Sequence, residues 1–154
     1  MSYRIAVITS SPNKDGLTAA CGKAAQKGSV DTGATVDLID LNSYDVGRCK
    51  ACGTGYGTCR TEHSCQVQDD FQSLHERLVS ADAYAVVTPV YWGDLSESAK
   101  AFLDRVRRCE ATSREASRLS GKRPEVAAGA RSHVFLTCSS CLTTCAPRYS
   151  ISSR

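Results

Sequence analysis

A polar loop follows the first apolar run of the chain, and its side chains can bind an anion. Residues 10–18 lie between the β-branched run 3–9 and an Ala-rich run that begins at position 17. A loop between a strand and a helix N-terminus collects backbone N–H groups around a negative charge. We therefore predict a phosphate site here, with an ordinary turn as the alternative. The candidate ligands are Ser10, Ser11, Asn13, Lys14, Gly16 and Thr18.

A second loop carries the only tryptophan of the chain. The apolar run 83–88 is stopped by Pro89, which cannot donate a ladder hydrogen bond. Loops that leave the carboxyl ends of parallel strands line the ligand crevice of an open sheet, so exposed aromatic side chains here indicate a flat ring as the ligand. The alternative is that the aromatic side chains pack on the local core. The loop consists of Val90, Tyr91, Trp92, Gly93 and Asp94.

Spacing excludes three other chemistries for these loops. The chain has no G-x-x-x-x-G-K-[ST] sequence, so the first loop is not a P-loop for nucleotide hydrolysis. The glycines of residues 53–57 lack G-x-G-x-x-G spacing and do not follow an apolar run, which argues against a Rossmann dinucleotide site. No cysteine precedes an arginine by six residues in the first loop, which removes a thiolate phosphatase.

Four of the nine cysteines lie in one glycine-rich segment, spaced C-x2-C-x6-C-x5-C. Four thiolates so close in sequence could bind zinc or a four-iron cluster. A loop of free thiols with a structural or subunit-contact role is the alternative. The candidate metal ligands are Cys49, Cys52, Cys59 and Cys65. Cys138, Cys141 and Cys145 form a second, weaker motif, and we expect Cys21 and Cys109 to be packing residues on helices.

Alternating strands and helices must position these loops. We expect strands at 3–9, 34–41 and 83–88, helices at 17–27, 69–80 and 96–108, and a long loop at 42–68. The polar segment 110–124 could extend the last of these helices. A strand, helix and strand in succession start a right-handed parallel crossover, so the pattern predicts an α/β fold with a doubly wound parallel sheet of order 2-1-3-4-5. The two loops then flank the point where the strand order reverses.

Histidines offer no general acid or base in this sequence. His63, His75 and His133 do not group with an Asp/Ser pair, and we expect His75 to lie on the surface of an amphipathic helix. Catalytic residues are therefore left unassigned.

Length and charge favour one globular domain. The chain has 154 residues and a net charge of +3, and residues 105–154 carry ten Lys/Arg against three Asp/Glu. Aromatic residues are not interleaved with the arginines of residues 105–125, so we expect no nucleic-acid partner. The N-terminus lacks a signal-type apolar run, and no stretch is long enough to span a membrane, so we expect a cytoplasmic protein with reduced cysteines and no membrane partner.

The same segments resemble the flavodoxin-like NAD(P)H-dependent FMN reductases, which include the iron-sulfur flavoproteins. The resemblance rests on residues 10–18, on the Cys loop that ends in Asp69-Asp70-Phe71, and on residues 88–93 with 100–105. It implies a three-layer fold and a flavin ring against Pro89 to Gly93. It also implies that the FMN phosphate is held by Ser11, Asn13, Lys14, Leu17 and Thr18. Ser10 stands where the family has Gly, and Leu17 where it has Asn.

The resemblance also implies a function. Reducing equivalents would pass from NAD(P)H through the flavin to a small acceptor such as a quinone, a nitroaromatic compound or free flavin, in a homodimer. The alternatives are an electron carrier, flavodoxin-like or with an iron-sulfur cluster on the Cys loop, and a zinc-stabilised interaction module.

The C-terminal tail departs from this pattern. We expect a flavodoxin-like FMN-binding domain at 1–124 and an atypical Ser/Thr/Cys-rich tail at 125–154, with one short strand at 132–137. The abrupt change of composition near Pro124 favours a truncated or frame-shifted reading, which would leave the C-terminal edge of the sheet incomplete.

Overall fold

Four parallel strands form the central sheet of the protein, which is described here from a computed structural model covering residues 2–111 and 117–124. The strands are β1 (Arg4–Thr9), β2 (Thr35–Asp40), β3 (Ala83–Val87) and β6 (Arg123–Pro124). Their order is β2-β1-β3-β6, and every pairing is parallel. β1 and β3 lie inside this sheet, which explains why their sequences are almost entirely apolar. The predicted doubly wound order is thereby confirmed for the strands that the structure describes.

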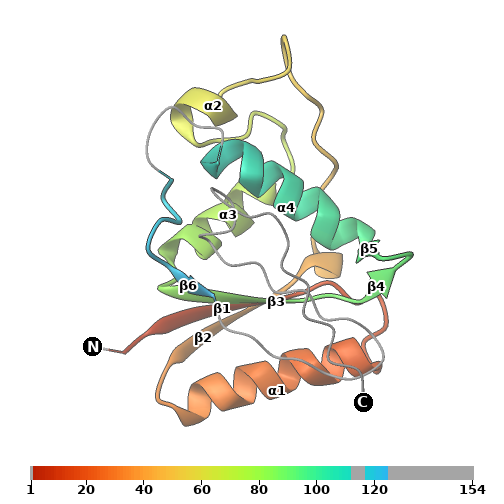
Figure 1. Ribbon diagram of the computed structural model, residues 1–154, viewed down its shortest axis with the longest axis vertical. Helices are drawn as coiled ribbons and strands as arrows, with labels where there is room; N and C mark the ends of the chain where they lie inside the picture. The colour runs from red at the N-terminus through yellow and green to blue at the C-terminus, as the bar shows by residue number, and fades with distance from the viewer. Residues whose placement is uncertain (1, 112–116, 125–154) are drawn as a thin grey trace.

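Helices cover both faces of this sheet and give three layers (Figure 1). One face is covered by α1 (Leu17–Asp31), and the other by α3 (Phe71–Ser80) and α4 (Glu97–Glu110). The main core lies between the sheet and the helices α3 and α4, where Phe71, Leu74 and Phe102 are fully buried.

Helix α1 extends four residues beyond the predicted end at position 27. Gly22, which weakens the intrinsic helix propensity, is buried against β1, and a Cβ there would stand 2.5 Å from Thr9 Cγ2. The glycine therefore allows a close approach of helix and strand.

Helices α3 and α4 begin close to their predicted positions. Asp69 Oδ1 accepts a hydrogen bond from Phe71 N at 3.1 Å, so an acidic side chain lies at the positive end of α3. Ser96 is the N-cap of α4 as predicted, because its side chain accepts a hydrogen bond from Ala99 N. The predicted pair of Lys100 and Asp104 is present on the outer face at 2.9 Å.

Two loops contain more structure than the sequence predicts. The long loop 42–68 overlaps the short 3-10 helix η1 (Leu41–Ser43) and contains the single-turn helix α2 (Cys59–Glu62). The loop after β3 is a hairpin of β4 (Val90–Tyr91) and β5 (Asp94–Leu95). Its turn residues Trp92 and Gly93 both have positive φ, 52° and 78°, which matches the primed turns that close two-residue hairpins.

The segment after α4 differs from the expectation of an extended helix. Residues 118–121 form a turn, Leu119 joins the core, and β6 pairs with β3 through Arg123 and Pro124. The predicted strand 132–137 and the tail 125–154 lie outside the described residues. Across 2–111 and 117–124, no helix combines the length and apolar composition that a membrane crossing requires.

Candidate functional site

The first loop forms a tight polar turn in front of α1. Ser11 Oγ donates to Asn13 O at 2.9 Å, and Asp15 N donates to Asn13 Oδ1 at 3.0 Å. Gly16 occupies the N-cap position of α1 with no side-chain capping bond. The first N–H groups of the helix therefore lack the side-chain acceptor that a Ser or Asp cap would supply, and they can bind an anion.

The predicted phosphate ligands divide into exposed and buried groups. Asn13 and Lys14 are exposed beside the turn, whereas Thr18 is buried on the first turn of α1. Leu17 is 54% exposed but has no polar side-chain atom, so only its backbone N–H could contact a phosphate.

Ser10 was predicted as a phosphate ligand, but its hydroxyl lies inside the protein. Its side chain is fully buried and accepts a hydrogen bond from Ser96 Oγ at 2.8 Å. Thr88 Oγ1 lies 3.2 Å from the same Ser96 oxygen and accepts a bond from Ser96 N at 3.3 Å. We call Ser10, Thr88 and Ser96 the hydroxyl cluster, and it ties the end of β1 to the end of β3 and the start of α4.

The hairpin after β3 presents aromatic side chains to solvent. Trp92 is 105% exposed and Tyr91 is 51% exposed, while Pro89 is buried and Val90 half-buried. The alternative that both aromatic side chains pack on the local core is therefore wrong for Trp92.

A groove of about 730 Å³ lies along the carboxyl edge of the sheet, within the roughly 300–1,000 Å³ of small-molecule sites. It joins the first loop, the hairpin, the start of α4 and the Cys loop. We call it the sheet-edge groove. Its lining includes Ser10, Pro12, Tyr91, Ser96, Arg48 and Cys49.

The sequence did not lead us to expect that residues of the Cys loop line this groove. Asn42 and residues 46–49 follow β2, and the rule that ligands bind beyond the carboxyl ends of strands would have included them. Of the residues predicted to bind the cofactor, Ser10 and Tyr91 line the groove. The others are not part of its lining: Ser11, Asn13, Lys14, Gly16, Leu17, Thr18, Pro89, Val90, Trp92 and Gly93.

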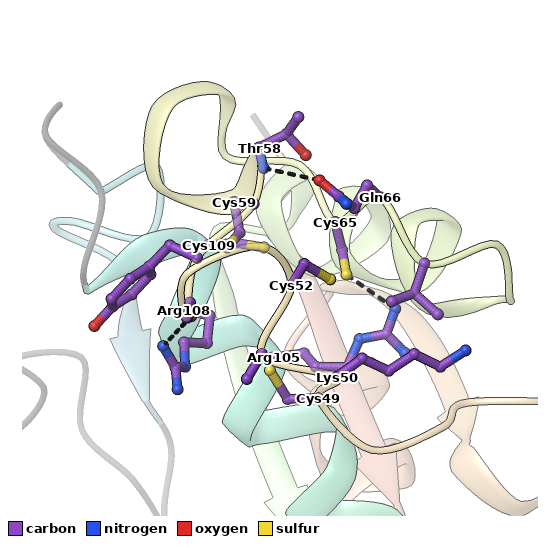
Figure 2. A pocket seen from close by; sticks show the side chains of 15 residues that line it. Cys49, Lys50, Cys52, Thr58, Cys59, Cys65, Gln66, Arg105, Arg108 and Cys109 are labelled. Atoms are coloured by element: carbon purple, nitrogen blue, oxygen red, sulfur yellow. Dashed lines mark hydrogen bonds between the residues drawn. The ribbon is translucent and has the colours of Figure 1, made fainter.

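A second, much smaller pocket gathers the loop cysteines (Figure 2). We call it the thiol pocket, and its five cysteines are Cys49, Cys52, Cys59, Cys65 and Cys109. Cys109 comes from α4 and is fully buried, as expected of a packing residue, but it was not expected to lie beside the other thiols. Burial raises the pKa of the Cys109 thiol to about 12, and the charges of Cys59 and Cys65 add to this effect.

The thiol pocket does not fit the predicted metal site. Its volume is about 20 Å³, close to the space for one water molecule. In the part of the chain that the structure describes, no three His, Cys, Asp or Glu side chains converge as metal ligands.

Arg105 holds the Cys loop against α4. Its side chain is 1% exposed, donates to both carboxylate oxygens of Asp69 and to Gly47 O at 3.0 Å, and donates to Cys65 Sγ at 3.2 Å. Burial would raise the pKa of Asp69, but the bonds from Arg105 and from the backbone N–H groups of Phe71 and Gly47 outweigh it and lower that pKa.

His75 is fully buried, so the prediction of a surface histidine was wrong. Its Nε2 lies 2.9 Å from Glu110 Oε1, and His63 Nδ1 lies 3.7 Å from the other oxygen of the same carboxylate. Arg118 N donates to Glu110 Oε2 at 2.6 Å. Burial alone would raise the pKa of Glu110, but the contacts from His75, Ser117 and Arg118 lower it to about 2. This carboxylate cluster joins α3, α4 and the segment before β6.

A parallel sheet with helices on both faces and a groove at its carboxyl edge is typical of a flavodoxin-like protein. The family model described as NADPH-dependent FMN reductase matches residues 3–136, and the chain belongs to that family. The resemblance seen in the sequence and the predicted fold class are thereby confirmed.

Relatives and solved structures agree with this assignment. The chain is similar to iron-sulfur flavoproteins of Methanosarcina thermophila, at 31% identity over 66% of this chain and 51% of the relative, and of Archaeoglobus fulgidus, at 30% over 64% and 43%. It thus spans about half the length of the curated relatives it matches. Its fold is similar to an NAD(P)H:quinone oxidoreductase of Methanothermobacter marburgensis, with a TM-score of 0.62, 21% identity, and coverage of 76% of this chain and 59% of that one. A putative quinone reductase of Klebsiella pneumoniae gives a TM-score of 0.56, 20% identity, and coverage of 68% and 45%.

Proposed function

We propose that this chain binds FMN in the sheet-edge groove and transfers reducing equivalents from NAD(P)H to a small acceptor. The observation that carries the proposal is the groove itself, which joins the first loop to the hairpin at the point where the strand order reverses. Membership of the FMN reductase family supports the choice of FMN over other flat phosphate-bearing ligands.

The residues divide between the two ends of such a ligand. The uncapped N-terminus of α1, with Ser11, Asn13, Lys14 and Thr18, would hold the phosphate. Residues 89–93 would lie against the isoalloxazine ring, with Tyr91 as a side wall. Bound FMN would supply the hydride and electron chemistry. The chain's own part is to orient the ring, through the hydroxyl cluster and the hairpin, and to keep water from one of its faces.

Turnover assays test the proposed enzyme class. Steady oxidation of NADH or NADPH that depends on added FMN and on a quinone, nitroaromatic or flavin acceptor is expected. Flavin that binds and accepts electrons only from a chemical reductant would contradict the enzyme proposal.

An electron carrier is the second candidate, because the curated relatives are named iron-sulfur flavoproteins. A carrier would pass electrons from the flavin to a partner protein without turnover of a substrate of its own. Iron and sulfide analysis of the purified protein distinguishes a cluster-bearing carrier from a flavin-only one.

Assembly and location complete the proposal. The fully exposed Trp92 beside the groove is consistent with a homodimer in which the neighbouring subunit covers the hairpin. Analytical ultracentrifugation tests this, and a monomer at micromolar concentration with FMN bound would contradict it. We further propose a cytoplasmic location, with an FMN domain at 1–124 and a separate tail at 125–154.

A further inference from the structure

A groove of about 720 Å³ lies along the Cys loop, beside the sheet-edge groove. We call it the Cys-loop groove, and its lining comes from residues 45–51 and 67–69. Its volume is within the range of small-molecule sites. Gly47, Arg48 and Cys49 line both grooves, so the two grooves meet at these residues. A ligand that is longer than the sheet-edge groove can therefore extend into the Cys-loop groove.

The backbone where the two grooves meet is held by a buried ion pair. Arg105 Nη1 donates to Gly47 O at 3.0 Å, and Gly47 N donates to Asp69 Oδ2 at 3.1 Å. The side chains of Arg105 and Asp69 also bind each other, and they are 1% and 6% exposed. Arg48 thus follows a fixed stretch of backbone, which limits the conformational entropy that is lost when its side chain binds a ligand.

Two exposed cations line the Cys-loop groove and have no partner in the described part of the chain. The side chains of Arg48 and Lys50 make no hydrogen bond or ion pair there. Of the two carboxylates in the lining, Asp69 is already bound to Arg105, and Asp45 is exposed and pairs with neither cation. Residues 46–61 contain no Asp or Glu. The groove therefore offers two cations to an anionic ligand.

The two nicotinamide donors differ in one group, the 2′-phosphate on the adenosine half of NADPH. A phosphate monoester carries about two negative charges at pH 7. Arginine accommodates this phosphate in dinucleotide sites, because its guanidinium can donate two parallel hydrogen bonds to phosphate oxygens. Lysine adds a compact point charge. The pair of cations in the Cys-loop groove therefore matches the charge of the 2′-phosphate.

We propose that the Cys-loop groove binds the adenosine half of the hydride donor, with Arg48 and Lys50 on its 2′-phosphate. The proposal rests on the proposed function, since the nicotinamide half would then reach the flavin in the sheet-edge groove. Arg48 lies where the two grooves meet, whereas Lys50 lines the Cys-loop groove but not the sheet-edge groove. These two side chains set the preference for NADPH over NADH and take no part in the chemical step.

Calorimetry with fragments of the two donors tests this binding site without turnover. The full chain is titrated with adenosine 2′,5′-bisphosphate and, separately, with adenosine 5′-monophosphate, each in the presence and in the absence of FMN. We expect the bisphosphate to bind about tenfold more tightly, because it alone carries the 2′-phosphate.

Substitutions that remove one charge assign the preference to the two cations. Arg48→Gln and Lys50→Gln should each remove most of the difference between the two nucleotides and leave the affinity for the monophosphate unchanged. Both side chains are exposed, so neither substitution disturbs the core. Arg107→Gln is the matched control, because it removes an exposed charge from α4 outside the lining of both grooves and should leave the preference unchanged.

Steady-state kinetics separates a failure of this inference from a failure of the proposed function. We expect a larger kcat/KM for NADPH than for NADH, with the difference in KM and with its loss in Arg48→Gln. Equal kcat/KM values for the two donors would overturn the inference and leave the proposed function intact. Arg48-dependent binding of the bisphosphate by protein that oxidises neither donor would support the 2′-phosphate site and contradict the proposed function.

Two binding results would also overturn the inference. One is equal affinity of the full chain for the bisphosphate and the monophosphate. The other is an equal loss of affinity for the bisphosphate in Arg48→Gln and Arg107→Gln, which would show that the positive charge of the whole surface attracts the nucleotide.

Discussion

Ser96 links the two loops that form the proposed flavin site. Its hydroxyl contacts Ser10 from the first loop and Thr88 from the end of β3, and it caps α4 at the same time. All three hydroxyls are buried, so the loss of one leaves its partners without full hydrogen bonding in a place that water does not reach. The spacing between the first loop and the hairpin therefore depends on the side chain of Ser96.

Replacing Ser96 by Ala should weaken FMN binding about tenfold, which corresponds to ~1.4 kcal/mol. The reason is that the first loop and the hairpin would no longer be fixed relative to each other. Titration of flavin fluorescence measures this, and Ser73→Ala, which removes one exposed hydroxyl from α3, is the matched control. Lower thermal stability with unchanged FMN affinity would show that Ser96 acts only as a helix cap.

Glu110 contributes stability that depends on pH. Its folded-state pKa of about 2 lies below its ordinary value of 4.5, so the charged form is favoured in the folded protein. The contribution is fully present above pH 4.5 and is lost as the pH falls towards 2. A shift of this size corresponds to about 3 kcal/mol in a group that is almost completely buried.

The variant Glu110→Gln should therefore be less stable than the wild type at pH 7 and should lose less stability on acidification. Urea unfolding at pH 7, 4.5 and 3 measures the difference, with the exposed Glu62→Gln as control. Parallel losses in the wild type and Glu110→Gln over this range would contradict the role given to the carboxylate cluster.

At the scale of elements, the two faces of α1 have different tolerance for side chains. Gly22 packs against Thr9 of β1, whereas a Cβ on Gly28 would meet nothing within 4 Å. Both residues lie in the same helix, so intrinsic helix propensity alone would make both alanine variants more stable.

The matched pair Gly22→Ala and Gly28→Ala tests this packing. We expect Gly28→Ala to stabilise the protein by up to ~1 kcal/mol and Gly22→Ala to destabilise it by ~1–3 kcal/mol, because the new methyl group would overlap Thr9. Chemical denaturation gives both values. A stabilising Gly22→Ala would mean that α1 does not approach the sheet as closely as described.

Elements with strong local signals could be predicted from the sequence, and contacts between distant segments could not. The apolar runs of β1 and β3 and the N-cap Ser96 each have a short-range pattern. His75 also had such a signal, since it lies four residues after Phe71 and three before Leu78 and thus on the buried face of α3. Its partner Glu110 is 35 residues away in sequence, so the pairing depends on how α3 and α4 pack.

At the scale of the whole molecule, the strand order could be predicted from the sequence, but the full lining of the sheet-edge groove could not. The first loop and the hairpin both reach this groove, through Ser10 and Pro12 and through Tyr91. Residues 46–49 approach the carboxyl edge of the sheet because Arg105 binds Gly47 and Asp69. These contacts join segments that are far apart in sequence, so no short sequence pattern predicts them. The thiol pocket forms through the same contacts, because Arg105 also holds Cys65.

Binding of FMN to the purified full chain tests the central claim most directly. The account predicts that added FMN loses its fluorescence and shows a perturbed visible absorption spectrum, saturating at one flavin per chain. Protein that stays colourless after incubation with FMN, with flavin fluorescence unchanged, would contradict it.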